Sequence, residues 1–410
     1  MSPDALQAAD RRATTREWLA VAAVALGTFT LVTSEFIPVG LLTRMAPDLH
    51  ASEGAVGLMM TIPALVAAVS APAAMLGARH LDRRVILWLL SALLVVSNLV
   101  VAYAPTLPVA LFGRVLLGID VGAFWAISSI VAGKLVPSAS LSRANSIIFA
   151  GISLGTVVGV PAGAFIGSAL GWRAAFETVA IFGAVVLMAQ IVYLPRIPPS
   201  EVVSVKHLAA IFRIPKARLG LIVCFFIFLA QFAGYTYMGA FLEQVTLASP
   251  SLLSSLLLGY GLAGFIGNFV GGSLAPRNPL MALMGTSLLM GVSIVLLTLM
   301  GHSQAPASLM VLAWGFAFGA LPIATQAWML KVAPGEMESA SAVYISILQL
   351  GFASGAFFGG RVVDTLGVNM TLAGAGVIAV LAAVVVLQFG RERGVSARAA
   401  TTAAACQQAD

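Results

Sequence analysis

Charged residues are scarce in this chain. Asp, Glu, Lys and Arg together make up 9% of its 410 residues, whereas they make up roughly 25% of an average water-soluble domain. Hydrophobic residues make up 60%, and the mean hydropathy is +1.00. So few charges argue against a water-soluble fold, and the composition predicts an integral membrane protein.

Cysteine and histidine are also rare, and their positions exclude several kinds of chemistry. The cysteines, Cys224 in an apolar run and Cys406 near the C-terminus, lack the spacing of a metal site or a disulfide framework. All four histidines fall in expected loops: His50, His80, His207 and His302. The chain contains neither H-E-x-x-H nor a G-x-x-x-x-G-K-[ST] phosphate loop. The sequence therefore predicts no enzyme, no metal and no cofactor, and it leaves carboxylates as the only candidate proton carriers inside the membrane.

The basic residues set an orientation instead of indicating nucleic-acid binding. They give a net charge of +6 but are scattered among short loops. If the N-terminus is cytoplasmic, alternate loops place 18 of the 22 Lys and Arg residues on the cytoplasmic side. Arg44, Arg173 and Arg361 lie on the opposite side, and Arg114 is embedded. This bias predicts that both termini are cytoplasmic and that the number of spans is even.

Twelve apolar runs are long enough to cross a hydrocarbon layer of roughly 30 Å. They cover residues 18–43, 54–78, 85–104, 107–131, 144–169, 175–194, 219–242, 253–275, 279–300, 307–331, 341–363 and 370–389. We therefore expect an all-α integral membrane fold of twelve transmembrane helices. Its expected parts are an N-terminal six-helix bundle (1–194), a proline-rich cytoplasmic linker (195–218), a C-terminal six-helix bundle (219–390) and a cytoplasmic tail (391–410). Residues 203–218 of the linker form either an amphipathic helix on the inner leaflet or a flexible tether.

The two halves of the sequence repeat each other. A shift of 197 residues maps one set of residues onto another: Gly118, Gly122, Ala123, Lys134 and Pro137 onto Gly315, Gly319, Ala320, Lys331 and Pro334. A shift of 192 maps residues 163–167 onto 355–359. Two related six-helix halves are typical of transporters in which the solute binds near mid-membrane, in a central cavity between two bundles.

Several motifs carry a family resemblance. They are Leu111-Phe-Gly-Arg114-Val-Leu-Leu-Gly118, Gly155-Thr-Val-Val-Gly159-Val-Pro161-Ala-Gly163 and Gly171-Trp-Arg-Ala-Ala-Phe176. They resemble the fourth-helix motif, the fifth-helix antiporter motif and the turn into the sixth helix of the drug:proton antiporter branch of the major facilitator superfamily. The fifth-helix motif has one extra residue between glycine and proline. Asp82, Arg83 and Arg84 resemble the family's loop after the second helix, without its spacing and its second glycine.

Within that branch, the segments Glu35-Phe-Ile-Pro38 and Gly122-Ala-Phe124-Trp125-Ala are most similar to purine ribonucleoside efflux pumps, with sugar-efflux relatives next. The resemblance implies proton-coupled secondary efflux of a small uncharged solute by alternating access, from a monomer in the bacterial cytoplasmic (inner) membrane. The expected partners are the solute, protons and the lipid bilayer. Efflux of sugars or amphipathic drugs is the alternative, and a membrane-embedded hydrolase or a receptor without transport are the competing classes.

Three ionisable residues lie deep in the expected spans: Glu35, Arg114 and Asp120. At 1.5 Å per residue, Glu35 and Arg114 lie roughly 12 and 10 Å from the same membrane face. Because the first and fourth helices are neighbours in the resembled fold, we expect Glu35 to pair with Arg114 and to exchange a proton. A permanent salt bridge is the alternative. Asp120, turned about 120° from Arg114 around the helix, binds the solute, takes a second proton or bonds a neighbouring helix.

Hydrogen-bonding and flat side chains suggest where a solute could bind. Amides and phenols in the second half are accompanied by two aromatic rings in the first: Gln231, Tyr235, Tyr237, Gln326 and Gln349, with Phe124 and Trp125. Together they would suit an uncharged, planar, hydroxylated solute. For each residue alone, an interhelical hydrogen bond or a lipid-facing ring is the competing interpretation.

Glycines at positions 151, 155, 159, 163 and 167 recur at every fourth residue, which gives one helix face almost no side chain. Such a face either packs statically or, as the family resemblance implies for Gly155, Gly159, Pro161 and Gly163, slides during the transport cycle. Two ion pairs are expected at the outer surface: Arg173 with Glu177, and Arg361 with Asp364.

Overall fold

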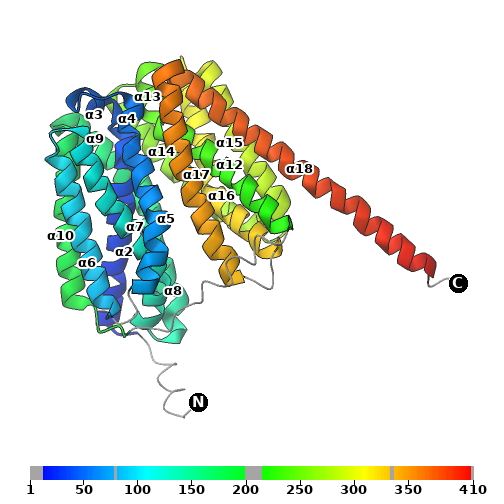
Figure 1. Ribbon diagram of the computed structural model, residues 1–410, viewed down its shortest axis with the longest axis horizontal. Helices are drawn as coiled ribbons and strands as arrows, with labels where there is room; N and C mark the ends of the chain where they lie inside the picture. The colour runs from blue at the N-terminus through cyan, green and yellow to red at the C-terminus, as the bar shows by residue number, and fades with distance from the viewer. Residues whose placement is uncertain (1–12, 78–80, 199–214, 333–336, 408–410) are drawn as a thin grey trace, which may run out of the picture.

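The computed structural model describes residues 13–77, 81–198, 215–332 and 337–407, and within these ranges the chain forms helices and turns without strands (Figure 1). Twelve helices in this part of the chain are long and apolar enough to cross a membrane, so the predicted all-α fold is confirmed. Most of the expected linker, residues 199–214, lies outside the described residues. The expected tail continues α18 as far as Gln407.

The long helices follow the expected apolar runs. They are α2 (Thr15–Phe36), α5 (Leu58–Gly77), α6 (Arg83–Ala102), α7 (Leu107–Leu135), α8 (Leu141–Leu154) with α9 (Val160–Leu170), α10 (Trp172–Tyr193), α12 (Pro215–Thr236), α14 (Pro250–Leu274), α15 (Pro279–Met300), α16 (Gln304–Val332), α17 (Met337–Leu366) and α18 (Val368–Gln407). Short helical turns connect or interrupt them: η1 (Ile37–Gly40), α3 (Leu42–Asp48), α4 (Glu53–Val56), η3 (Ser138–Ser140), the π-helical turn η4 (Gly155–Gly159) and α13 (Met238–Gln244).

Local sequence sets where the helices begin and end. The Thr14 hydroxyl accepts a hydrogen bond from the Glu17 backbone N–H, and the Glu17 carboxylate accepts one from the Thr14 N–H, which forms a capping box at the start of α2. At the start of α14 the Ser249 hydroxyl accepts from the Leu252 N–H at 3.2 Å, and Pro250 follows at the first helical position. At the far end of α2, Pro38 lacks the N–H that an α-helix needs, and the chain continues as the 3₁₀ turn η1.

The helices of the two halves pack in the same pairs. In the first half α5 packs on α7, α2 on α8, and α6 on both α7 and α10. The second half repeats these contacts with α14 on α16, α12 on α17, and α15 on both α16 and α18. The internal repeat in the sequence therefore corresponds to a repeat in packing.

The matching glycines explain how these pairs approach so closely. A Cβ atom on Gly122 would lie 2.6 Å from the carbonyl oxygen of Ala67 in α5, and one on Gly319 would lie 1.8 Å from the carbonyl oxygen of Gly264 in α14. Neither position leaves room for a side chain. The 197-residue shift thus aligns glycines that perform the same task, bringing helix backbones into contact in each half.

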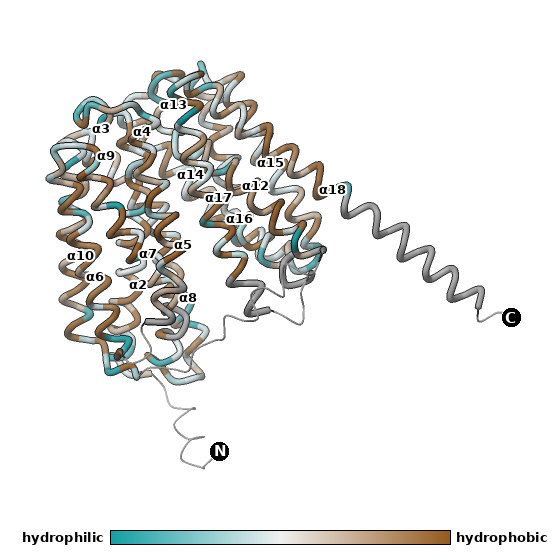
Figure 2. The backbone as a smooth tube through the Cα atoms, viewed as in Figure 1, coloured by the Kyte–Doolittle hydropathy of each residue, from teal (hydrophilic) through white to brown (hydrophobic). Residues whose placement is uncertain are grey.

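The two halves meet at one end and diverge toward the end where α2 begins (Figure 1). At the meeting end, a Cβ on Gly54 would lie 2.2 Å from the carbonyl oxygen of Gly360, and one on Gly239 would lie 2.4 Å from that of Val39. Hydrophilic residues gather at both ends of the molecule, and the lengths of the helices between are mainly hydrophobic (Figure 2). This distribution is the one expected of helices that span a bilayer.

Hydrogen bonds also join the halves at the meeting end. Asp364 accepts one from the Ser52 hydroxyl (2.8 Å) and one from the Gly54 N–H (2.9 Å). The Gln244 amide donates to Glu53 at 2.6 Å, and the Thr43 hydroxyl donates to the Glu243 carboxylate. These bonds close the gap between the halves at this end.

The structure contradicts the prediction of two surface ion pairs. Asp364 bonds to the opposite half as described, while the Arg361 guanidinium lies over the Phe357 ring, 5.6 Å from its centroid. Arg173 pairs with Asp48, with 2.7 Å between Nη1 and Oδ2, instead of with Glu177. Both expectations considered only residues close in sequence, and tertiary contacts supplied better partners.

Candidate functional site

Arg114 is fully buried in α7 and bonds to three backbone carbonyl groups. Its Nε donates to the carbonyl of Met59 at 2.6 Å, and its two terminal nitrogens donate to those of Ser34 and Glu35 at 2.8 Å each. Two of these carbonyls lack their usual helical donor because a proline follows four residues later: Pro38 after Ser34, and Pro63 after Met59. The guanidinium therefore satisfies carbonyl groups that prolines leave unbonded in α2 and α5.

The Glu35 side chain is left without the partner that the sequence suggested. Its residue is 5% exposed, and Arg114 contacts its carbonyl oxygen instead of its carboxylate. Among the described residues, none lies within hydrogen-bond or ion-pair distance of the carboxylate. The expected pairing is thus replaced by two neighbouring groups: a guanidinium fixed by backbone carbonyls and a carboxylate that bonds to none of the described residues.

Asp120, the second embedded carboxylate, lies on another face of α7. It follows Gly113 by seven residues and so shares its face, and a Cβ on Gly113 would lie 2.8 Å from the Val101 side chain of α6. Asp120 is 2% exposed, and its Oδ2 has no hydrogen-bond partner among the residues that the structure describes. The structure therefore holds two buried carboxylates in the first half, each with unused hydrogen-bonding capacity.

Buried amides in the first half were missed by the sequence analysis. The Ser34 hydroxyl donates to the Asn98 amide oxygen at 3.0 Å, and the Ser91 hydroxyl donates to the Gln190 amide oxygen at 2.8 Å. Asn98 and Gln190 are each a single amide side chain within an apolar run, and that pattern could have indicated a hydrogen bond between helices. These bonds link α6 to α2 and to α10, so the polar interior of the first half extends beyond its charged residues.

The expected solute-binding residues do not form one group. Gln231 donates to the Tyr260 hydroxyl at 2.8 Å and accepts from the Trp314 indole at 2.7 Å. Tyr237 lies at the meeting end, where its hydroxyl donates to the Ala356 carbonyl at 2.9 Å. A Cβ on Gly57 would lie 1.9 Å from that same hydroxyl, so Tyr237 fills the joint between the halves.

The remaining expected residues are dispersed. Phe124 and Trp125 are edge-to-face neighbours at 5.6 Å, and Phe124 is buried in the core of the first half. Gln326 is exposed and Gln349 is partly buried, and neither makes a hydrogen bond with a residue that the structure describes. Among the expected residues of the second half, Tyr235 and Gln231 share a neighbourhood, because both contact Tyr260.

That neighbourhood is an aromatic cluster that the sequence analysis did not identify. It consists of Phe36, Phe232, Tyr235, Tyr260, Phe318 and Phe352. Phe232 and Phe352 stack with their centroids 3.8 Å apart and an interplanar angle of 16°. Phe36, which directly follows Glu35, comes from the opposite half and lies parallel to both within 7° and 11°. The aromatic cluster thus joins α2 to α12 and α17 beside the Glu35 carboxylate.

The glycine face of α8, η4 and α9 packs on α2 and its extension, as the spacing predicted. A Cβ on Gly155 would lie 2.9 Å from Val32, one on Gly159 would lie 1.9 Å from the Thr33 hydroxyl oxygen, and one on Gly163 would lie 2.4 Å from Ile37. The segment Gly155–Gly159 is a π-helical turn, and Pro161 follows two residues after its end. A π turn accommodates one additional residue in a helix, which matches the extra residue in this motif.

The loop residues Asp82, Arg83 and Arg84 form contacts within the first half. Asp82 caps α6 by accepting from the Arg84 N–H at 2.9 Å, and it also accepts from the Ile197 N–H at 2.9 Å. Arg84 lies over the Trp88 ring at 4.7 Å. These contacts hold the start of α6 against the segment that follows α10; residues 78–80 of this loop lie outside the described residues.

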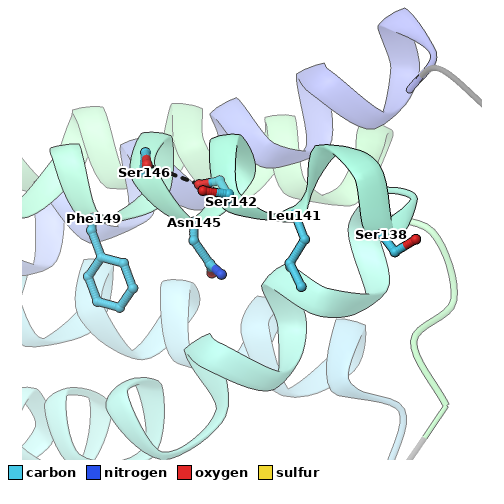
Figure 3. A pocket seen from close by; sticks show the side chains of 6 residues that line it. All are labelled: Ser138, Leu141, Ser142, Asn145, Ser146 and Phe149. Atoms are coloured by element: carbon cyan, nitrogen blue, oxygen red, sulfur yellow. Dashed lines mark hydrogen bonds between the residues drawn. The ribbon is translucent and has the colours of Figure 1, made fainter. Parts of the chain in front are cut away.

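A cavity of about 660 Å³ lies along η3 and α8, lined by Ser138, Leu141, Ser142, Asn145, Ser146 and Phe149. Figure 3 shows Leu141, Asn145 and Phe149 projecting to the same side of α8, while Ser146 donates to the Ser142 carbonyl at 2.9 Å. This part of α8 lies toward the end where the two halves diverge (Figure 1). It provides a partly polar wall there.

Sequence comparison places these features in a known context. Residues 24–356 match the sequence model of a family described as the Major Facilitator Superfamily. The purine ribonucleoside efflux pump NepI of Salmonella typhi is 33% identical over 369 residues, covering 90% of this chain and 93% of that protein. NepI of Salmonella gallinarum gives the same values.

Solved structures share the fold. A bacterial homolog of the human lysosomal transporter Spinster, in an inward-facing and unoccupied conformation, has a TM-score of 0.78 at 16% identity, covering 93% of this chain and 98% of that one. A POT family transporter in complex with 5-aminolevulinic acid has a TM-score of 0.74 at 13% identity, covering 92% and 96%. These similarities extend over both halves.

Proposed function

The chain belongs to the major facilitator superfamily, and from that premise we propose that it exports purine ribonucleosides from the bacterial cytoplasm in exchange for protons. It is a multi-pass membrane transporter and not an enzyme. The similarity to NepI over 90% of the chain supports both the direction of transport and the solute class. The proton coupling is supported by one observation, the buried Glu35 carboxylate that no described residue pairs with.

The proposed orientation places both termini in the cytoplasm of a bacterial cell. The distribution of Lys and Arg between the loops supports it. The end where the halves diverge then faces the cytoplasm, and the end closed by Asp364, Ser52 and Gly54 faces outward. In this arrangement the molecule is open to a solute from inside, and release outward requires the bonds at the meeting end to break while the other end closes.

In the proposed cycle Glu35 takes up a proton from the outer side and releases it to the cytoplasm. A carboxylate in hydrocarbon is costly in its charged form, by about 2.5 kcal/mol or more at mid-membrane. Loading a proton on the carboxylate oxygen removes that charge, and this favours the conformation in which Glu35 is enclosed. Because α2 carries Glu35 and packs against the glycine face of α8, η4 and α9, we propose that this contact slides when the protonation state changes.

Asp120 is the second candidate for the same role. It is also buried, and its Oδ2 has no hydrogen-bond partner in the described part of the chain. In the proposed arrangement Glu35 carries the coupled proton, while Asp120 bonds to the solute or takes a second proton. If Asp120→Asn abolishes the proton coupling and Glu35→Gln does not, the roles of the two carboxylates are the reverse of those proposed.

The proposal is tested with inverted membrane vesicles, whose interior corresponds to the outside of the cell. We expect labelled inosine and adenosine to accumulate when the vesicle interior is acidified. The Glu35→Gln variant should lose this accumulation, while Glu177→Gln, which removes a carboxylate at the end of the molecule, should retain it. Undiminished proton-driven uptake by Glu35→Gln contradicts the assignment of the coupling carboxylate.

The same vesicles distinguish the alternative substrates. Accumulation of a labelled arabinose-type sugar without nucleoside uptake would indicate a sugar exporter, and uptake of amphipathic drugs alone would indicate a drug exporter. The sequence similarity to NepI favours nucleosides over both.

A further inference from the structure

We propose that the parallel rings of Phe36, Phe232 and Phe352 form the subsite that holds the flat base of the solute, with Phe36 as its movable wall. This inference rests on the proposed function, because it assigns the part of the nucleoside that these side chains recognise. It was not among the solute-binding residues expected from the sequence.

The geometry of the three rings carries the inference. Phe232 of α12 and Phe352 of α17 are stacked at 3.8 Å and are 3% and 1% exposed. Phe36 of α2 is parallel to both, but its centroid lies 6.1 Å from that of Phe232 and 5.7 Å from that of Phe352. Isolated aromatic pairs more often meet edge to face or offset, so three nearly parallel rings are an unusual arrangement. Their parallel faces can stack with another flat ring, such as a base.

The rings belong to different halves of the transporter. Phe232 and Phe352 move with the second half, whereas Phe36 ends α2 in the first. A change in the relative position of the halves, which alternating access requires, therefore changes the spacing between Phe36 and the other two. Phe36 is also partly exposed, unlike its two partners, so it is the ring that a solute can reach.

A polar group lies at the edge of the stack. Tyr235 stands edge-on to Phe36 at 5.9 Å and to Phe232 at 6.4 Å. Its residue is 4% exposed, and its hydroxyl makes no hydrogen bond with any residue that the structure describes. A phenol beside stacked rings can donate to a ring nitrogen or an exocyclic oxygen of a base. The neighbouring Gln231 amide already has one partner at each end, Tyr260 at its nitrogen and Trp314 at its oxygen, so the Tyr235 hydroxyl has more unused hydrogen-bonding capacity.

The position of Phe36 links base binding to proton coupling. It follows Glu35 directly, and Arg114 holds the Glu35 carbonyl. A base that displaces the Phe36 ring acts on the residue next to the proposed proton carrier. Two consecutive residues of α2 would thus contact both partners of transport: Phe36 the solute, and Glu35 the proton.

The test compares binding and transport of inosine, uridine and ribose by the full-length protein. Base stacking on an aromatic side chain predicts that Phe36→Ala raises the Kd and KM for inosine about tenfold or more. Phe36→Tyr, which keeps the ring, should stay within about threefold of the parent. Inhibition by ribose, which has no base, should not change. Phe269→Ala removes a 65% exposed ring of α14 and is the matched control.

The outcomes separate this inference from the proposed function. If the parent protein transports inosine and Phe36→Ala has an unchanged KM, the base subsite lies elsewhere although the transporter assignment stands. If ribose and inosine are affected equally, stacking is not the cause and the inference is also overturned. If the parent moves no nucleoside but binds another flat solute in a Phe36-dependent manner, the subsite stands and the nucleoside assignment falls. Thermal unfolding in detergent confirms that each variant is folded.

Discussion

The two halves of this transporter share a packing scheme but differ in what they bury. The first half encloses Glu35, Arg114 and Asp120, whereas the buried polar residues of the described second half are uncharged. The second half encloses instead most of the aromatic cluster, together with the Gln231 amide and its two partners. Because the glycines that set helix spacing repeat in both halves, the difference lies in the side chains and not in the architecture.

This comparison suggests a division of tasks. The carboxylates proposed for proton coupling lie in one half, and most of the aromatic cluster proposed to hold the base lies in the other. Phe36 is the exception, because it belongs to the first half but packs with the rings of the second. The residue that crosses between the halves is therefore the natural place for the two tasks to meet.

The largest effect on stability is expected at Arg114, the membrane-embedded cation of the first half. Arg114→Lys keeps the charge but removes the fork that binds three carbonyl groups, and we expect a loss on the order of 3 kcal/mol in unfolding free energy. Adding Pro38→Ala restores an N–H near the Ser34 carbonyl and should recover about 1 kcal/mol. Thermal unfolding in detergent measures both.

Arg143→Lys is the control for that experiment, because Arg143 lies over the Trp18 ring at the protein surface. It should cost no more than about 1 kcal/mol. Equal losses for Arg114→Lys and Arg143→Lys would mean that the buried carbonyl contacts do not stabilise the first half.

A smaller effect on stability is expected when a repeated glycine is replaced by alanine, and its size should differ between the two halves. A Cβ on Gly355 would lie 2.3 Å from the Leu229 carbonyl oxygen, which the backbone of α12 holds in place. One on Gly163 would lie 2.4 Å from Cγ1 of Ile37, a buried side chain and not a backbone atom. We therefore expect Gly355→Ala to cost about 1–3 kcal/mol and Gly163→Ala to cost less, since a side chain shifts more easily than backbone and alanine gains about 1 kcal/mol in helix propensity.

Gly133→Ala provides the reference for these two variants, because no atom of the described residues lies within 4 Å of its added Cβ. Its thermal unfolding midpoint should equal or exceed that of the parent. If Gly355→Ala matched Gly133→Ala, the close approach of α12 and α17 would be looser than the structure describes.

The smallest effect concerns the outer edge of the first half, at Asp48. Hydrogen bonds from Trp172 and Arg173 hold the pKa of Asp48 below its ordinary value of 3.8. A lowered pKa stabilises the folded protein above pH 3.8, and that stabilisation disappears as the pH falls further. Asp48→Asn should therefore cost less than about 1 kcal/mol at pH 7, and the difference from the parent should shrink below pH 3.8. A difference that is constant with pH would exclude an ionic cause.

Much of the fold could be predicted because bilayer physics leaves few alternatives. Twelve apolar runs gave twelve helices within the described residues, and the 197-residue repeat located Gly122 and Gly319 at equivalent helix contacts. The embedded charges were found for the same reason, since each is costly in hydrocarbon. The π turn was signalled by the extra residue before Pro161, although its form was not predicted.

The partners of the buried groups were harder to predict. Arg114 was expected to meet a carboxylate, because opposite charges attract, but the sequence also shows Pro38 and Pro63 four residues after Ser34 and Met59. The aromatic cluster joins helices far apart in the chain, and single phenylalanines are too common in membrane helices to be informative. Tyr237 was grouped with Tyr235, yet it follows the end of α12 and fills the joint between the halves.

The division of tasks is tested most directly by measuring inosine counterflow and proton-driven inosine accumulation in the same vesicles. Counterflow requires binding and the conformational change but no net proton movement. Glu35→Gln should keep counterflow and lose accumulation, whereas Phe36→Ala should weaken both to the same extent through a higher KM. Loss of counterflow in Glu35→Gln, or accumulation that survives without Glu35, would contradict the separation of proton and solute between the two halves.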